Sequence, residues 1–163
     1  MKKKSTIAII AILAALAVGV AVLAALSGKS AVEKRLLLDD AAFLIVAGED
    51  EYRVTMEEFL ALEQQEIEAN YKKNNKDPET RTYTGAPFAA VLRMKAIDLA
   101  DITTAVFSAA DNYTSPLPIE DALDEENCFI VADSGGEGPF RMILAKDQFS
   151  QRWCKLLTDV TLK

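Results

Sequence analysis

Histidine is absent from this chain of 163 residues. It is the side chain that most often serves as a general base and as a metal ligand in proteins. Its absence excludes Ser-His-Asp and Cys-His catalytic arrangements, together with every zinc site that includes an imidazole.

Positive charge is scarce outside the N-terminus. The chain has 18 Lys and Arg against 25 Asp and Glu, and four of the basic residues (Lys2, Lys3, Lys4 and Lys29) lie in the first 29 positions. Residues 30–163 therefore carry 14 basic and 25 acidic side chains, a net charge of −11. Such a domain repels phosphate backbones, so we expect no nucleic-acid partner. The excess of carboxylates indicates a solvated surface that favours solubility.

Charge is missing altogether from residues 6–26, a run of 21 residues made almost entirely of Ala, Ile, Leu and Val. As a helix rising about 1.5 Å per residue, this run would span the ~30 Å hydrocarbon core of a bilayer. It is longer than the apolar region of about 7–15 residues in a secretory signal. We therefore expect one retained N-terminal transmembrane helix. A signal sequence cleaved near residues 24–28 is the alternative.

The basic head at Lys2, Lys3 and Lys4 predicts a cytoplasmic N-terminus, which places the rest of the chain outside the cell membrane. We expect residues 1–29 to form the head and the anchor or signal sequence, residues 30–41 a linker, and residues 42–163 one domain. The membrane is then the expected partner of the N-terminal helix, and secretion after cleavage is the alternative location. No Cys follows the apolar run, which excludes a lipoprotein attachment.

Periodicity in residues 42–163 predicts many short strands and few short helices, which is typical of an α+β fold with mixed β-sheets. A hairpin is expected from residues 42–47 and 52–55 around a turn at residues 48–50. Thr55 and Glu58 have capping-box spacing and predict a helix with Met56, Phe59 and Leu60 on one face. A second helix is expected to begin at Pro87 and present Phe88, Val91 and Leu92, and a third at residues 118–123. A strand is predicted at residues 67–71, and a second strand follows it and returns towards Tyr83. Further strands are predicted at 103–108, 128–132, 140–145 and 153–162, with a turn at 109–114 and a loop at 133–138.

Cysteine occurs twice, at Cys128 and Cys154, each within a predicted strand. Two buried free thiols that behave as small apolar side chains are the leading interpretation. A disulfide, which an extracytoplasmic location favours, would close a loop of about 26 residues and contribute on the order of 3 kcal/mol. A role for either thiol as a metal ligand is the third possibility. In the last strand, Cys154, Leu156, Val160 and Leu162 are expected on one face, with Trp153 packing on the other or lining a cleft.

Three linked motifs lie between residues 83 and 163. They are Tyr83-Thr84-Gly85-Ala86-Pro87-Phe88, then Ser108-Ala109-Ala110-Asp111-Asn112-Tyr113, and then Gly138-Pro139-Phe140-Arg141-Met142-Ile143-Leu144 followed by Arg152-Trp153-Cys154-Lys155. In this order they resemble the molybdopterin-binding domain of the sulfite oxidase family. The resemblance implies an α+β domain whose catalytic members hold molybdenum through a Cys thiolate and a dithiolene pterin, with basic side chains on the cofactor's phosphate. Carried onto this sequence, the cofactor-binding residues are Tyr83, Asp111, Asn112, Tyr113, Arg141 and Arg152.

The metal-ligating cysteine of the catalytic members has no counterpart here. Its segment precedes the Tyr83 motif and corresponds to the interval between Leu62 and Tyr83, which contains neither Cys nor His. No other side chain there replaces a thiolate on a soft metal. We therefore predict a non-catalytic binding or interaction module with no catalytic residues, no metal and no cofactor, and with an unidentified protein as a possible partner. The alternative is a molybdenum-cofactor-dependent oxidoreductase, similar to sulfite oxidase, that acts outside the membrane.

Overall fold

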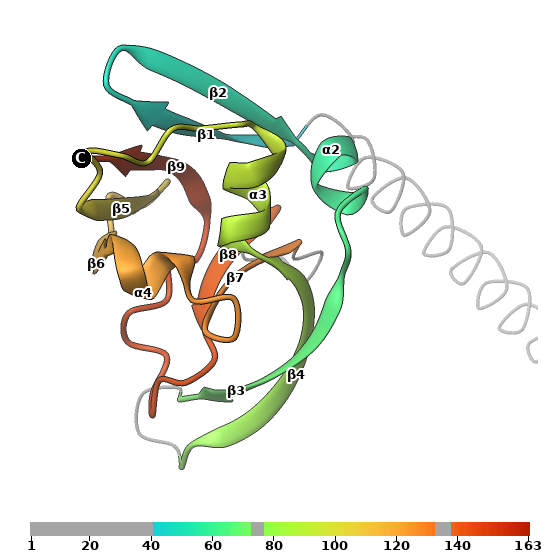
Figure 1. Ribbon diagram of the computed structural model, residues 1–163. Coiled ribbons are helices and arrows are strands. Elements are labelled where there is room, and N and C mark those ends of the chain that lie inside the picture. The colour runs from blue at the N-terminus through green and yellow to red at the C-terminus, as the bar shows by residue number, and fades with distance from the viewer. Residues whose placement is uncertain (1–40, 73–76, 133–137) are drawn as a thin grey trace, which may run out of the picture. The chain divides into compact units, whose positions relative to one another are not determined.

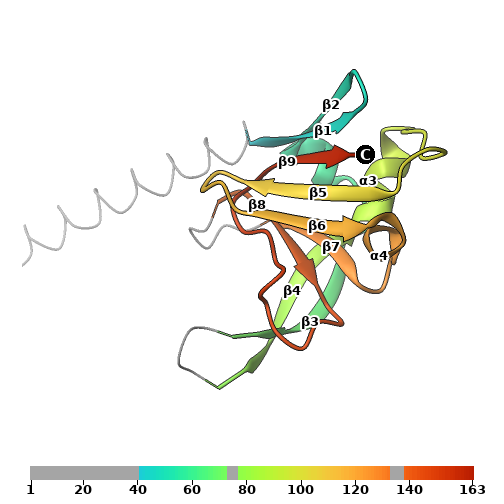
Figure 2. The same cartoon turned by 90° about the vertical axis from the view of Figure 1, so that its left-hand side faces the viewer.

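Two β-sheets and short helices make up the described part of the chain in the computed structural model, which covers residues 41–72, 77–132 and 138–163. The predicted α+β class is therefore confirmed, and of the two described sheets the larger is mixed while the smaller is antiparallel. The strands of the larger sheet lie together in Figure 2, and the short helices lie against the sheets in Figure 1.

The larger sheet has the strand order β2-β1-β9-β5-β6. Its one parallel pair joins β1 to β9, and the other neighbours are antiparallel. Alternate residues of β1, β5 and β6 face the core, as the period of two requires. In β9 the buried Leu157 and Val160 are three residues apart, beside a shift in the register with β5. The strands are β1 (Ala42–Ala47), β2 (Asp50–Thr55), β5 (Thr104–Ala109), β6 (Thr114–Pro118) and β9 (Leu157–Leu162).

The smaller sheet is antiparallel throughout, with the order β3-β4-β7-β8. Its central strand β7 and the neighbouring β8 are almost wholly buried, which explains why their residues are apolar apart from Arg141 of β8. The hairpin of β3 and β4 extends away from the larger sheet in Figure 2. The strands are β3 (Gln65–Tyr71), β4 (Glu79–Pro87), β7 (Cys128–Ala132) and β8 (Phe140–Leu144).

Three short helices connect the strands: α2 (Met56–Leu60), α3 (Phe88–Met94) and α4 (Ile119–Leu123). The predicted capping box opens α2, because the Glu58 amide donates to Thr55 Oγ1 (3.3 Å) and the Thr55 amide donates to Glu58 Oε2 (2.9 Å). Helix α3 buries Phe88, Val91 and Leu92, as its spacing predicts, and packs against α4, β4 and β7.

Aromatic rings join the two sheets into one core. Phe140 of β8 meets Phe43 of β1 edge to face at 5.0 Å between ring centroids, and Phe59 of α2 in the same way at 5.5 Å. Phe88 of α3 contacts Phe107 of β5 at 4.9 Å. All five rings are buried.

Two details of the predicted helices are wrong. Leu60 does not share the buried face of α2 with Met56 and Phe59. It is 54% exposed, because this five-residue helix has one turn and its last residue faces solvent. Pro87 is the last residue of β4 and occupies the N-cap of α3, so its fixed backbone precedes the helix.

The larger departures concern two strands. Residues 114–118, predicted as the end of a turn and the start of a helix, form β6, and the helix begins one residue after Pro118. The last strand begins at Leu157 instead of residue 153, because Leu156 has a positive φ of 54° that interrupts an extended chain. Leu157, not Leu156, faces the core beside Val160 and Leu162, and Cys154 makes only an isolated bridge to Met142.

No helix within the described ranges has the length and hydropathy needed to cross a membrane. The predicted anchor and almost all of the predicted linker lie outside those ranges, as does most of the predicted loop at 133–138. The described residues form one compact unit.

Candidate functional site

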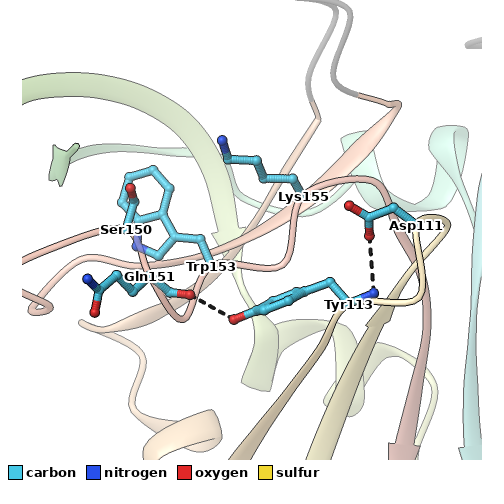
Figure 3. A pocket seen from close by; sticks show the side chains of 6 residues that line it. All are labelled: Asp111, Tyr113, Ser150, Gln151, Trp153 and Lys155. Atoms are coloured by element: carbon cyan, nitrogen blue, oxygen red, sulfur yellow. Dashed lines mark hydrogen bonds between the residues drawn. The ribbon is translucent and has the colours of Figure 1, made fainter. Parts of the chain in front are cut away.

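A pocket of about 220 Å³ opens between the β5–β6 hairpin and the chain segment that precedes β9. Figure 3 shows Asp111 and Tyr113 of the hairpin on one side and residues of the later segment on the other. Two of the predicted site residues therefore lie in one pocket. The described residues that line it are Asp111, Tyr113, Ser150, Gln151, Trp153 and Lys155.

Hydrogen bonds hold the hairpin side of the pocket in place. Asn112, the third predicted residue of this turn, adopts a positive φ of 66°, which Asn tolerates better than most residues. Its amide donates to the Ala109 carbonyl at 3.0 Å. The Tyr113 amide donates to Asp111 Oδ1 at 3.2 Å. Asn112 thus shapes the turn that directs Asp111 and Tyr113, and it does not line the pocket.

Two further bonds tie the hairpin to the facing segment. Tyr113 donates its hydroxyl hydrogen to the Gln151 carbonyl at 2.7 Å, as Figure 3 shows. The Ser115 hydroxyl donates to the Arg152 carbonyl at 2.6 Å. Both bonds reach main-chain atoms, so they fix the path of the irregular segment that precedes β9.

Trp153 both packs in the core and lines the pocket, the two roles that its sequence left open. It is 2% exposed, and its indole N–H donates to the Leu144 carbonyl at 3.3 Å. Its ring meets Tyr83 edge to face at 5.5 Å and Tyr71 at 6.1 Å. The indole therefore separates the pocket from a second group of predicted residues.

Tyr83 and Arg141 form that second group. The Tyr83 hydroxyl oxygen is buried, and burial raises the pKa of Tyr83 while the positive charges of Arg141 and Arg81 oppose the shift. The Arg141 side chain is 4% exposed, with its guanidinium carbon 5.9 Å from the centre of the Tyr83 ring. Neither residue lines the pocket of Figure 3.

Arg152, the last of the predicted site residues, belongs neither to the pocket lining nor to the group of Tyr83 and Arg141. Its Nε donates to Asp147 Oδ2 at 2.9 Å, and its guanidinium also lies 3.9 Å from Asp121 Oδ2. The bond to Asp147 is the main reason why the pKa of Arg152 is raised. Two carboxylates already compensate its charge, which leaves little attraction for the phosphate that the family resemblance implies at this position.

Beyond Trp153, three basic side chains lie over aromatic rings. The Arg81 guanidinium lies 3.9 Å from the centre of the Tyr71 ring, and Lys155 Nζ lies 5.1 Å from it. Lys72 Nζ lies 4.7 Å from the centre of the Phe149 ring. Sequence reasoning missed this group, and it also missed Ser150, Gln151 and Lys155. The contact of Arg81 with Tyr71 arises from the pairing of β4 with β3, whereas those of Lys72 and Lys155 depend on how an irregular segment packs against this hairpin.

Both thiols are free and fully buried, which agrees with the leading interpretation of the cysteines. Burial raises the pKa of the Cys154 thiol to about 12 and that of Cys128 further still, so both remain protonated at neutral pH. The described residues include no group of three or more His, Cys, Asp or Glu side chains that could hold a metal ion. These residues do not fit the thiolate ligation of molybdenum that the family resemblance implies, and we derive no chemistry through that group.

Among the comparisons with known proteins, only the comparison with solved structures found a match. No protein-family model and no curated protein sequence matches the chain. The crystal structure of the sulfane dehydrogenase SoxCD from Paracoccus pantotrophus is similar, with a TM-score of 0.62 and 15% sequence identity over 76% of this chain. The chain spans 38% of the SoxCD chain that it matches, and at this identity the likeness shows a shared fold.

Proposed function

We propose that this protein is a membrane-anchored, extracytoplasmic binding or interaction module, built on a fold distantly related to the molybdopterin-binding domain of sulfite-oxidase-like enzymes, and that it is not itself catalytic. The likeness to sulfane dehydrogenase SoxCD and the three sequence motifs support the relationship. The pocket between Asp111 and Lys155 supports a role in binding.

The burial and protonation of the two thiols are the main support for the proposal that the protein is not catalytic. A thiolate ligand must be deprotonated and must reach the metal. Cys128 and Cys154 are fully buried, and their raised pKa values keep them protonated. The interval before Tyr83, where the resemblance would require the ligand, contains no Cys.

Metal analysis of the full chain tests this part. Protein purified from its native host, grown with molybdate, should contain no stoichiometric molybdenum and no pterin fluorescence after oxidation. The alternative is a molybdenum-dependent oxidoreductase acting outside the membrane, which the shared fold favours. One molybdenum per chain, lost in Cys154→Ala or Cys128→Ala but retained in a Ser150→Ala control, would establish that alternative and overturn the proposal.

Topology tests the location. The uncharged run at residues 6–26 and the lysines before it support an anchor with the domain outside. Protease added to intact spheroplasts should digest the domain, and the chain should remain in the membrane fraction after a carbonate wash. A domain that resists protease until the membrane is broken would contradict the proposed orientation, whereas release of intact domain into the medium would indicate a cleaved signal.

A further inference from the structure

The described strands form two sheets with four edges, and these edges differ in how they are protected. Edge strand β6 carries Pro116 and Pro118, which have no amide hydrogen to donate to a further strand. Edge strand β8 is covered where Met142 and Cys154 exchange two main-chain hydrogen bonds, at 2.8 and 3.1 Å. Strand β2 has neither protection, and no described strand lies beside it on the side away from β1 in Figure 1.

The fourth edge strand, β3, has basic side chains around its end. Arg81 and Lys155 lie over the ring of Tyr71, the last residue of β3. The amide of Lys72, the next residue, donates to Ser150 Oγ at 3.2 Å. The protein's own chain therefore occupies that end of β3, whereas the edge of β2 can accept a further strand.

Negative charge gathers where β2 begins. Glu49, Asp50 and Glu51 are consecutive and exposed. A pocket of about 260 Å³ opens between this hairpin and the segment that joins α3 to β5, and the exposed Asp98 and Asp101 lie on its far side. The ion pairs of the described residues include none of these five carboxylates. The described lining of the pocket contains no Lys or Arg, so a cation would be attracted there.

The edge and the pocket meet on one face of β2. Asp50 and Tyr52 are two residues apart, so their side chains share a face of the strand, and both line the pocket. A strand paired with β2 would place every second side chain on that same face, beside the pocket. A long basic side chain suits this position, because its stem can pack on Tyr52 and Ile102 while its charged end reaches the carboxylates.

From the edge, the charge and the pocket together we propose that β2 binds an extended, basic segment of a partner protein by strand addition. Main-chain hydrogen bonds hold the segment against β2, and one of its Lys or Arg side chains enters the pocket among Asp50, Asp98 and Asp101. A second copy of the chain does not suit this edge, because residues 30–163 carry a net charge of −11 and like charges would meet. This inference rests on the proposed role as an interaction module and specifies the class of partner.

A synthetic peptide of seven residues in which lysine alternates with valine, with blocked ends and a fluorescent dye, tests the proposal. Its fluorescence anisotropy is measured as full-length protein in mild detergent is added. We expect saturable binding that weakens as sodium chloride is raised from about 50 to about 500 mM, because the carboxylates are exposed. The same peptide with glutamate in place of each lysine should not bind.

Methylation of the peptide main chain separates strand addition from plain attraction of charges. One peptide carries N-methyl groups at its lysines and another at its valines, and both keep the full positive charge. Because alternate N–H groups of an added strand point toward its neighbour, at least one of the two peptides should bind about tenfold more weakly than the parent. Hydrogen exchange at residues 48–55 of the protein should slow when the parent peptide binds.

Charge variants locate the site. Asp50→Asn and Asp101→Asn should each weaken the parent peptide about two- to fivefold, as expected for exposed ion pairs. Glu68→Gln removes the same charge from an exposed position of β3 and should bind the peptide like the wild type. Circular dichroism of each variant verifies its fold.

Four outcomes would overturn the inference. Equal binding of the glutamate peptide would remove the role of charge, and full binding of both methylated peptides would remove strand addition. A loss in Glu68→Gln without a loss in Asp50→Asn and Asp101→Asn would move the segment to β3. If the parent peptide does not bind, the inference about β2 falls alone, because molybdenum analysis and topology test the wider proposal independently.

Discussion

Glu58 combines a helix cap with an ion pair, and its protonation should therefore affect stability. Its Oε2 accepts the Thr55 amide at 2.9 Å, and Lys95 Nζ donates to its Oε1 at 2.7 Å. The bond from Lys95 is the main reason why the pKa of Glu58 lies below its usual value. A carboxylate with a lowered pKa stabilises the fold above its unfolded pKa, and this contribution is lost as the pH falls through the folded pKa.

We expect Glu58→Gln to lower the free energy of unfolding by about 0.5–1 kcal/mol at pH 7, because the glutamine can still accept the Thr55 amide but carries no charge for Lys95. The difference between the two proteins should shrink as the pH is lowered from 7 to 2, because the wild-type carboxylate becomes protonated as the pH falls through its folded pKa. Urea unfolding at both pH values measures the difference. Glu57→Gln removes the same charge from the same helical turn without affecting Lys95, and a similar loss in that control would assign the effect to the helix terminus alone.

The thiols allow a second test at the level of single residues. Cys128 and Cys154 are fully buried, and both have raised pKa values. We expect native protein at pH 8 to react with neither thiol within minutes when treated with a thiol-specific chromogenic reagent. In guanidinium chloride, two thiols per chain should react, with or without prior reductant. No reaction before reduction and two thiols after it would instead identify a disulfide.

At the level of elements, Gly85 controls the approach of β4 to β7. It lies opposite Val131, and a Cβ added at this position would be 2.3 Å from the main-chain oxygen of Ile130 and 2.9 Å from Val131 Cγ2. No side chain can approach a main-chain oxygen so closely, so the strands would have to separate. The close approach of the two strands therefore explains why a glycine occupies position 85 of the Tyr83 motif, independently of any ligand.

We expect Gly85→Ala to lower the free energy of unfolding by about 2–3 kcal/mol through overpacking between paired strands. Gly48→Ala is the matched control, because its turn has a positive φ of 62° but open space around the added carbon. It should cost only about 1 kcal/mol of backbone strain. Urea unfolding of both variants measures the difference, and equal losses would refute the steric explanation.

Strands and helices with strong local signals were predictable from the sequence. The β1–β2 hairpin, the cap at Thr55 and the limits of β7 follow from alternation, capping-box spacing and an apolar run. Strand β6 was missed because its prolines, Pro116 and Pro118, argue against a strand, and they are tolerated only because β6 is at the edge of its sheet.

Part of the site was also predictable, because some of its residues lie in a segment with a strong local signal. Asp111 and Tyr113 lie in a turn that the sequence marks, and they do line one pocket. Lys155 belongs to an irregular segment whose position is set by long-range bonds such as that from Tyr113 to the Gln151 carbonyl. No local pattern encodes such a contact, nor the pairing of Arg152 with Asp147.

At the level of the whole molecule, the two sheets depend on one shared core. Phe140 of the smaller sheet contacts Phe43 of the larger sheet and Phe59 of α2, and all three rings are buried. Because these rings join elements that no hydrogen-bonded ladder connects, the sheets should unfold together.

We expect Phe140→Ala to lower the free energy of unfolding by about 3–5 kcal/mol, the usual range for removing a buried phenyl ring. Phe149→Ala, at a half-buried ring outside the core, is the control and should cost less than about 1 kcal/mol. Trp153 emission reports on the smaller sheet through its contact with Tyr83 of β4, whereas far-ultraviolet circular dichroism reports on all elements. In the wild type the two signals should follow one transition. If they separate in urea, each sheet has its own stability, and Phe140→Ala should then shift only the transition that Trp153 reports.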